Sequence, residues 1–132
     1  MKRFILLAAV LVFLTGCQVQ TDSSKKVRDL EYTIVEEGKL PEKLGQVIAE
    51  KKGEPFKLTY QDQENLYVCA GYGEQPTGGY SIAVEEFYLT ENAIYFDTTL
   101  IGPGKEEKLT ETPSYPYIVI LTEDLELPVV FQ

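Results

Sequence analysis

The chain of 132 residues is long enough for one domain, and its formal net charge is −9 at pH 7. That charge does not suit binding to nucleic acid, whose phosphates require Lys and Arg, and it disfavours electrostatic docking on anionic lipid. The chain contains no histidine, so the most common general base of enzymes is missing from its repertoire.

The N-terminal segment is typical of a lipoprotein signal. A basic start, Met1-Lys2-Arg3, precedes an apolar run at 4–14, which is too short to span a bilayer because a span needs about 20 residues. The run ends in Leu-Thr-Gly-Cys at 14–17, which resembles a bacterial lipobox. We therefore expect cleavage after residue 16, lipidation of Cys17, and an extracytoplasmic domain held at the cell membrane by acyl chains. A plain signal peptide followed by an unrelated cysteine is the alternative.

This interpretation divides the chain into a signal peptide (1–16), the lipidated cysteine with a flexible polar tether (17–28) and one folded domain (29–132). Lipidation of Cys17 leaves Cys69 with no partner, so no disulfide is expected. Cys69 lies in the apolar stretch LYVCAGY without a basic neighbour. We interpret it as a small buried side chain and not as a nucleophile.

One helix is predicted near the start of the domain, after a first strand at 30–35. Pro41 suits the first helical position, and Lys51 and Lys52 suit the last turn before Gly53. Helical spacing places four apolar residues on one face, and a helix this short needs a sheet to cover with that face. These residues are Leu40, Leu44, Val47 and Ile48.

After Gly53 the apolar residues recur every second position, which predicts strands. Their parity changes within 80–89, and a β-bulge at Glu85-Glu86 would reconcile the two halves. The short connections favour antiparallel pairing. The predicted fold is mainly β, with about seven antiparallel strands in a small sandwich or open barrel and one short helix on one face. The further strands are expected at 56–61, 66–73, 80–89, 94–100, 115–122 and 125–131.

The segment QPTGGYSI at 75–82 is richer in Gly and Pro than a tight hairpin requires. Gly78 and Gly79 permit positive φ angles, Pro76 restricts the approach, and Tyr72 and Tyr80 lie at the edges. The connection is either a turn that only sets strand register or an exposed loop that contacts a partner.

The order of GYGEQPTGGYSI, then GPG, then SYPYIVI resembles the C-terminal domain of the protease complex subunit PrcB, over about residues 56–130. The resemblance implies a lipid-anchored accessory subunit without catalytic activity, which supports a secreted or surface protease. The partner-binding residues that we predict from the three loops are Pro76, Thr77, Gly78, Gly79, Tyr80, Gly102, Pro103, Gly104, Tyr115, Pro116 and Tyr117.

The same three loops are also similar to those of chagasin-like inhibitors of cysteine peptidases, which use Asn-Pro-Thr-Thr-Gly-Tyr, Gly-x-Gly-Gly and Arg-Pro-Trp patterns. Here Gln75 replaces Asn, Lys105 breaks the second pattern, and tyrosines flank Pro116 in the third. A protease inhibitor is therefore one alternative function, and it requires the loops to lie at one end of the fold. A structural envelope lipoprotein is another.

The residues offer little for chemistry. There is no Gly-x-Ser-x-Gly elbow, phosphate loop or Cys/His metal cluster. Pairs of adjacent acidic residues recur along the chain, at 36–37, 85–86, 106–107 and 123–124. None follows the residue order of a calcium-binding loop, and we interpret them as solvent-exposed. A hydrolase with two carboxylates is the only enzymatic alternative left open. We expect no enzyme, no cofactor and no metal.

Overall fold

A computed structural model describes residues 25–105 and 111–132, so the predicted signal peptide, Cys17 and most of the tether lie outside the described residues. No helix within these two ranges has the length and apolar character needed to cross a membrane. The elements are β1 (Arg28–Asp29), β2 (Thr33–Ile34), η1 (Glu37–Lys39), α3 (Glu42–Lys51), β3 (Pro55–Asp62), β4 (Asn65–Tyr72), β5 (Ser81–Leu89), β6 (Ile94–Ile101), β7 (Tyr117–Glu123) and β8 (Val129–Phe131).

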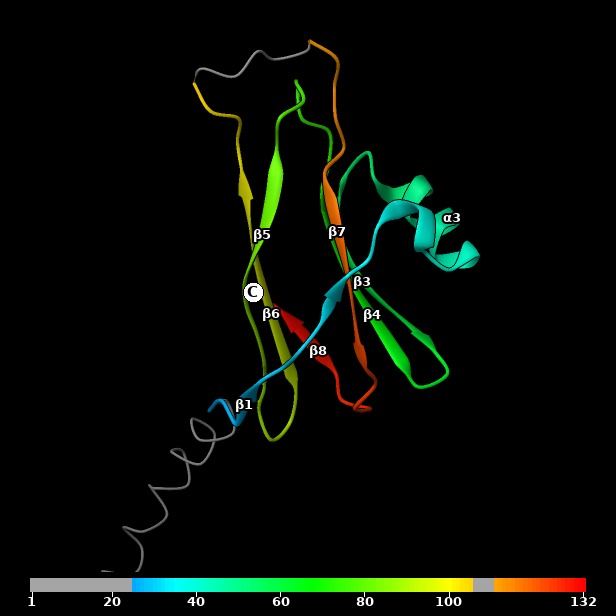
Figure 1. Cartoon of the computed structure of the whole chain (residues 1–132), viewed down its shortest axis with the longest axis vertical. Coiled ribbons are helices and arrows are strands. Elements are labelled where there is room, and N and C mark those ends of the chain that lie inside the picture. Colours follow the sequence, from blue (N-terminus) through cyan, green and yellow to red (C-terminus); the bar gives the residue numbers. More distant parts are fainter. Residues whose placement is uncertain (1–24, 106–110) are drawn as a thin grey trace, which may run out of the picture.

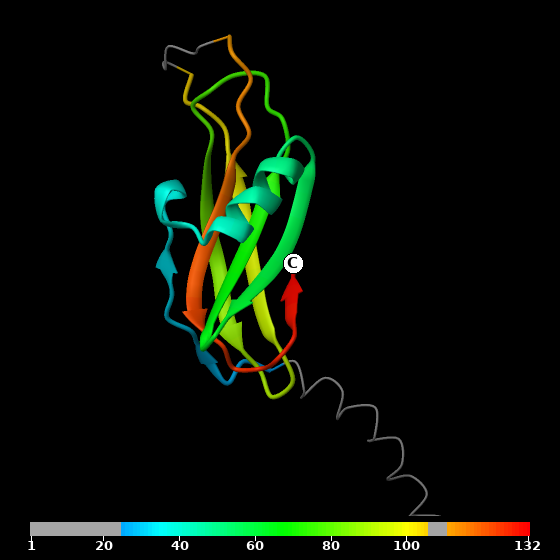
Figure 2. The same cartoon turned by 90° about the vertical axis from the view of Figure 1, so that its right-hand side faces the viewer.

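The strands form two four-stranded sheets packed face to face, as a sandwich. Sheet A has the order β1-β5-β6-β8 and sheet B the order β2-β7-β4-β3. Figures 1 and 2 show α3 against the outer face of sheet B. The mainly β fold with one helix is thus confirmed, and of the two predicted shapes the structure is a sandwich.

The alternation of apolar residues builds two cores, because β4 is buried on both faces. Leu66, Val68 and Ala70 face sheet A, whereas Tyr67 and Cys69 face the helix. The strand predicted at 125–131 forms only at Val129–Phe131 (β8). Alternate residues of this stretch are partly buried and pack against the first core, namely Leu125, Leu127, Val129 and Phe131.

The predicted strand at 30–35 is wrong in its extent, because only Thr33–Ile34 (β2) forms a strand within it, and β1 at Arg28–Asp29 precedes it. β1 pairs with β5 in sheet A, and β2 pairs with β7 in sheet B. Leu30 lies between them and is buried in the first core. Burial of this side chain between the sheets, with the chain crossing from one sheet to the other, explains why no continuous strand forms.

The short connections predicted antiparallel pairing throughout, and this prediction is wrong for one pair of strands. β6 and β8 are parallel neighbours, with Ile94 beside Val129 and Phe96 beside Phe131. The chain leaves sheet A after β6, forms β7 in sheet B, and returns as β8 in the same direction as β6. The crossover connection between the parallel strands β6 and β8 therefore contains β7, a strand of the opposite sheet, where such connections usually contain a helix.

Two local features of the sheets follow from particular residues. The register of β5 and β6 shifts between Val84 and Glu86, which confirms the predicted bulge. In sheet B, Phe56 lies opposite Gly71, and its ring occupies the space that a Cβ at residue 71 would fill. Position 71 therefore requires glycine for packing against Phe56, and not for the flexibility of the following turn.

Candidate functional site

The three predicted loops lie together at one end of the sandwich. β4 and β7 have their loop-side ends at Tyr72 and Tyr117, and β5 and β6 have theirs at Ser81 and Ile101. Figure 1 shows the connections between these strands gathered at the top, with the turns between the other strand ends at the bottom. The clustering that a loop-based binding surface requires is therefore present. We call residues 74–80, 102–105 and 113–117 the loop cluster; residues 106–110 lie outside the described residues.

The glycine-rich turn is held at its base and exposed at its tip. Gln75 and Ser114 form an isolated antiparallel bridge, with N···O distances of 2.8 and 3.0 Å. The Ser114 hydroxyl donates to the carbonyl of Thr77 at 2.7 Å. Pro76 and Gly79 are exposed beyond this anchor. Two loops far apart in sequence thus support one exposed tip.

Only one of the two adjacent glycines in this turn uses a conformation that other residues avoid. Gly79 has a φ of 87°, and Gly73, at the start of the connection, has a φ of 77°. Gly78 is not in this region. Of the two glycines that permit a positive φ angle in this turn, only Gly79 therefore uses one.

Tyr72 fixes the base of the loop cluster by joining the two sheets. Its hydroxyl lies 2.6 Å from the hydroxyl of Thr98 on β6. Its backbone N–H donates to Pro116 at 3.0 Å, and its carbonyl accepts from the side chain of Gln75 at 3.1 Å. This tyrosine, which the sequence placed at the edge of the loop, is half-buried and positions its neighbours.

Tyr80 and Gly102 bring the first loop beside the second. A Cβ built on Gly102 would lie 3.7 Å from the Tyr80 ring, at ordinary van der Waals distance, so the two loops lie side by side here. Pro103 is half-buried, and Gly102 and Gly104 are exposed. The first two patterns noted in the sequence therefore form one continuous surface.

The third loop contributes Tyr115 to the surface, whereas Tyr117 faces the helix side. The Tyr115 hydroxyl donates to Glu74 at 3.2 Å, and Lys52, beyond the end of α3, lies 5.6 Å from the Tyr115 ring centroid. The hydrogen bond to Glu74 raises the pKa of Tyr115. Tyr117 packs in the second core with Val119 and Cys69, and burial raises its pKa, with a smaller contribution from Glu37. Pro116 is half-buried between these two tyrosines.

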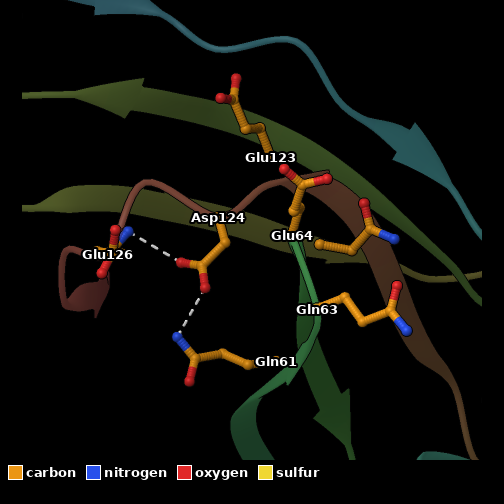
Figure 3. A pocket seen from close by; sticks show the side chains of 7 residues that line it. Gln61, Gln63, Glu64, Glu123, Asp124 and Glu126 are labelled. Carbon is orange, nitrogen blue, oxygen red and sulfur yellow. Dashed lines mark hydrogen bonds between the residues drawn. The ribbon is translucent and has the colours of Figure 1, made fainter.

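A cleft of about 790 Å³ lies at the opposite end, between the β3–β4 turn and the residues after β7 (Figure 3). Asp124 accepts from the side chain of Gln61 at 2.8 Å and from the backbone N–H of Glu126 at 2.9 Å. Both of its carboxylate oxygens are thus used within the protein. Within 25–105 and 111–132, no three Asp, Glu, Cys or His residues are arranged to hold a metal ion. The cleft gives acidic side chains a solvated position.

Cys69 is 0% exposed beneath the helix, and burial raises the pKa of its thiol from 9.0 to about 12. At pH 8 the thiolate fraction in the folded protein is therefore about a thousandfold lower than in the unfolded chain. We expect a Cys17→Ser variant, which retains only this thiol, to react with an aromatic disulfide reagent at least 100-fold more slowly when folded than in urea.

The pH dependence of stability follows from the same shift. The unfolded thiol ionises near pH 9 and the folded thiol near pH 12. The stability that this group contributes is complete below pH 9 and is lost as the pH rises towards 12. Equal reaction rates of Cys69 in the folded and unfolded protein would contradict the burial of this thiol and the raised pKa that follows from it.

The fold and loops define a small β-sandwich domain with one helix on its outer face and a glycine- and tyrosine-rich loop cluster at one end. Residues 66–123 match the family model described as PrcB C-terminal, which confirms the resemblance to the PrcB family indicated by the order of the sequence motifs. The matched segment runs from β4 to the end of β7 and contains all three loops. It is narrower than the expected resemblance over 56–130. Comparisons with the curated proteins and with the solved structures found no match.

Several residues in or beside the loop cluster carry no sequence signal of their role. Glu74, Ser114, Thr98 and Lys52 contact the predicted loop residues from 26 or more positions away in the chain. Their residue types are ordinary for a surface. The family match at 66–123 could have directed attention to the first three, but not to Lys52.

Proposed function

We propose that this domain is a non-catalytic protein-binding subunit of a protease complex, anchored to the membrane through lipidated Cys17 and contacting the protease through the loop cluster. The observation that carries the proposal is the position of all three loops at one end of the sandwich, within the segment that matches the PrcB family. An exposed tip on a braced base lowers the entropic cost of ordering a loop when a partner binds.

Pro76 offers a direct test, because it is exposed at the tip. The full chain, tagged at its C-terminus and extracted from the membranes of its own host in mild detergent, should co-purify a protease. A Pro76→Lys variant should reduce the recovered protease by at least about tenfold, which corresponds to about 1.4 kcal/mol, because a long charged side chain would replace a small rigid one at the contact. The matched control is Gln63→Lys, which adds the same charge at the exposed opposite end and should leave recovery unchanged.

Failure to recover any protease, or equal recovery with both variants, would overturn the proposal. Recovery of cell-wall material alone would favour the structural lipoprotein instead. The anchor has its own test: a Cys17→Ala variant should lose the incorporation of labelled fatty acid and leave the membrane fraction. Persistence of the label would exclude Cys17 as the lipidated residue.

A loop-based protease inhibitor is the second candidate function, favoured by the bridge between Gln75 and Ser114, which joins the first and third loops. Gln75, Lys105, Tyr115 and Tyr117 depart from the inhibitor patterns. Titration of cysteine peptidases with the purified protein separates the two candidates. An inhibitor abolishes peptidase activity at stoichiometric concentration, whereas an accessory subunit preserves or prolongs it.

A further inference from the structure

The outer face of sheet A is a second surface that the loop cluster does not include. The outer face of sheet B is covered by α3. On sheet A, no element of the described residues packs against the corresponding face (Figures 1 and 2). Its side chains form cross-strand rows, because residues directly opposite each other in β5 and β6 point to the same side.

One row contains a pair of stacked tyrosines. Tyr88 and Tyr95 lie opposite each other, with ring centroids 5.2 Å apart and ring planes 9° from parallel. Val130 extends the row on β8 and is 38% exposed. The row thus presents apolar and aromatic surface across three strands.

The next row places two carboxylates opposite each other. Glu86 on β5 is the register partner of Asp97 on β6. Like charges at directly opposite positions destabilise a sheet. A basic side chain of the same row would offset that repulsion, but neither residue has an ion-pair partner among the described residues.

The chain itself places one cation on this face. The ammonium of Lys26 lies 5.6 Å from the Tyr88 ring centroid and 2.9 Å from Asp29. The hydrogen bond to Asp29 raises the pKa of Lys26, and Glu86 and Tyr88 contribute in the same direction. This contact shows the chemistry that the surface favours: a cation held between an aromatic ring and carboxylates.

We propose that the outer face of sheet A binds an arginine-bearing segment of a protein partner, with the guanidinium paired to Glu86 and Asp97 beside the stacked tyrosines. Arginine suits the site better than lysine, because its planar fork can contact two carboxylates and also lie against an aromatic ring. The proposal does not depend on the loop cluster or on the identity of a protease.

Because the whole protein is acidic, the experiment must distinguish binding at this face from the general attraction of a cationic peptide to a negatively charged protein. The probe is a blocked hexa-arginine peptide, titrated into the full chain in detergent at 0.15 M salt, with binding measured by calorimetry. We expect Glu86→Gln/Asp97→Asn to weaken binding about tenfold. The matched control, Glu64→Gln/Glu123→Gln, removes two charges at the acidic cleft and should change the affinity less than about twofold.

Thermal unfolding of the double variant shows whether the two carboxylates of Glu86 and Asp97 act in binding or only in maintaining the fold. Removal of the like-charge pair should leave the Tm equal or higher, so a loss of binding cannot come from unfolding. Hexa-lysine should bind more weakly than hexa-arginine. Equal losses in the two double variants, no binding of hexa-arginine, or equal affinity for both peptides would overturn the proposal.

Discussion

Replacement of Phe96 by alanine is expected to lower the free energy of unfolding by about 3–5 kcal/mol. Phe96 is 1% exposed. It makes edge contacts with Phe87, at 5.6 Å between centroids, and with Phe131, at 6.1 Å. The loss includes the transfer of the ring from water, the cavity left between the sheets and these aromatic contacts. Because domains of this size are stable by about 5–15 kcal/mol, this loss is a large fraction of the total stability.

Urea unfolding followed by far-UV circular dichroism measures this loss. The matched control is Val130→Ala on the opposite face of the same sheet, which should cost less than about 1 kcal/mol because that side chain is partly exposed. A cost below about 1 kcal/mol for Phe96→Ala would mean that the first core is not built around this ring.

Periodicity in the sequence predicts which residues face inward, because that information is local. The change of parity within 80–89 predicts the bulge at Glu85-Glu86, and the register of β5 and β6 shifts between Val84 and Glu86. The helical spacing of Leu44 and Ile48 likewise predicts the buried face of α3. Both follow from the fact that a side chain must point either into the core or out of it.

The same alternation does not say which sheet a strand joins. Residues 30–35 look like one strand, because nothing in their pattern reveals that Leu30 lies between two sheets. The parallel pairing of β6 with β8 likewise depends on β7 lying in the opposite sheet. These are long-range choices, decided by how complete layers pack.

The candidate site divides in the same way. Gly79 and Tyr80 attract attention by composition, and the turn they form is indeed exposed at its tip. The contacts that hold the tip in place come from residues with no local signal: Thr98 bonds Tyr72, and Ser114 bonds Thr77. That this turn reaches the surface can be predicted from its sequence, whereas the residues that brace it come from distant parts of the chain and are known only from the fold.

Replacement of Leu44 by alanine is expected to cost about 2–5 kcal/mol, and to have a second effect that Phe96→Ala lacks. Leu44 is 0% exposed and packs with Ile48 over Tyr67, Cys69 and Val119. A helix of 10 residues is not stable alone in water, so its order depends on this contact with sheet B. Loss of the side chain should therefore let α3 separate from the sheet more often than the whole domain unfolds.

The thiol of Cys69 reports that separation, since it lies beneath the helix. In the Cys17→Ser background, Leu44→Ala should accelerate the reaction of Cys69 by more than the global loss of stability explains, whereas Phe96→Ala should accelerate it only in proportion to global unfolding. Gln46→Ala, on the exposed side of the same helix, should change neither stability nor reaction rate appreciably. If Leu44→Ala and Phe96→Ala give the same relation between rate and stability, the helix opens only with the whole domain, and its contact with sheet B is an integral part of one cooperative core.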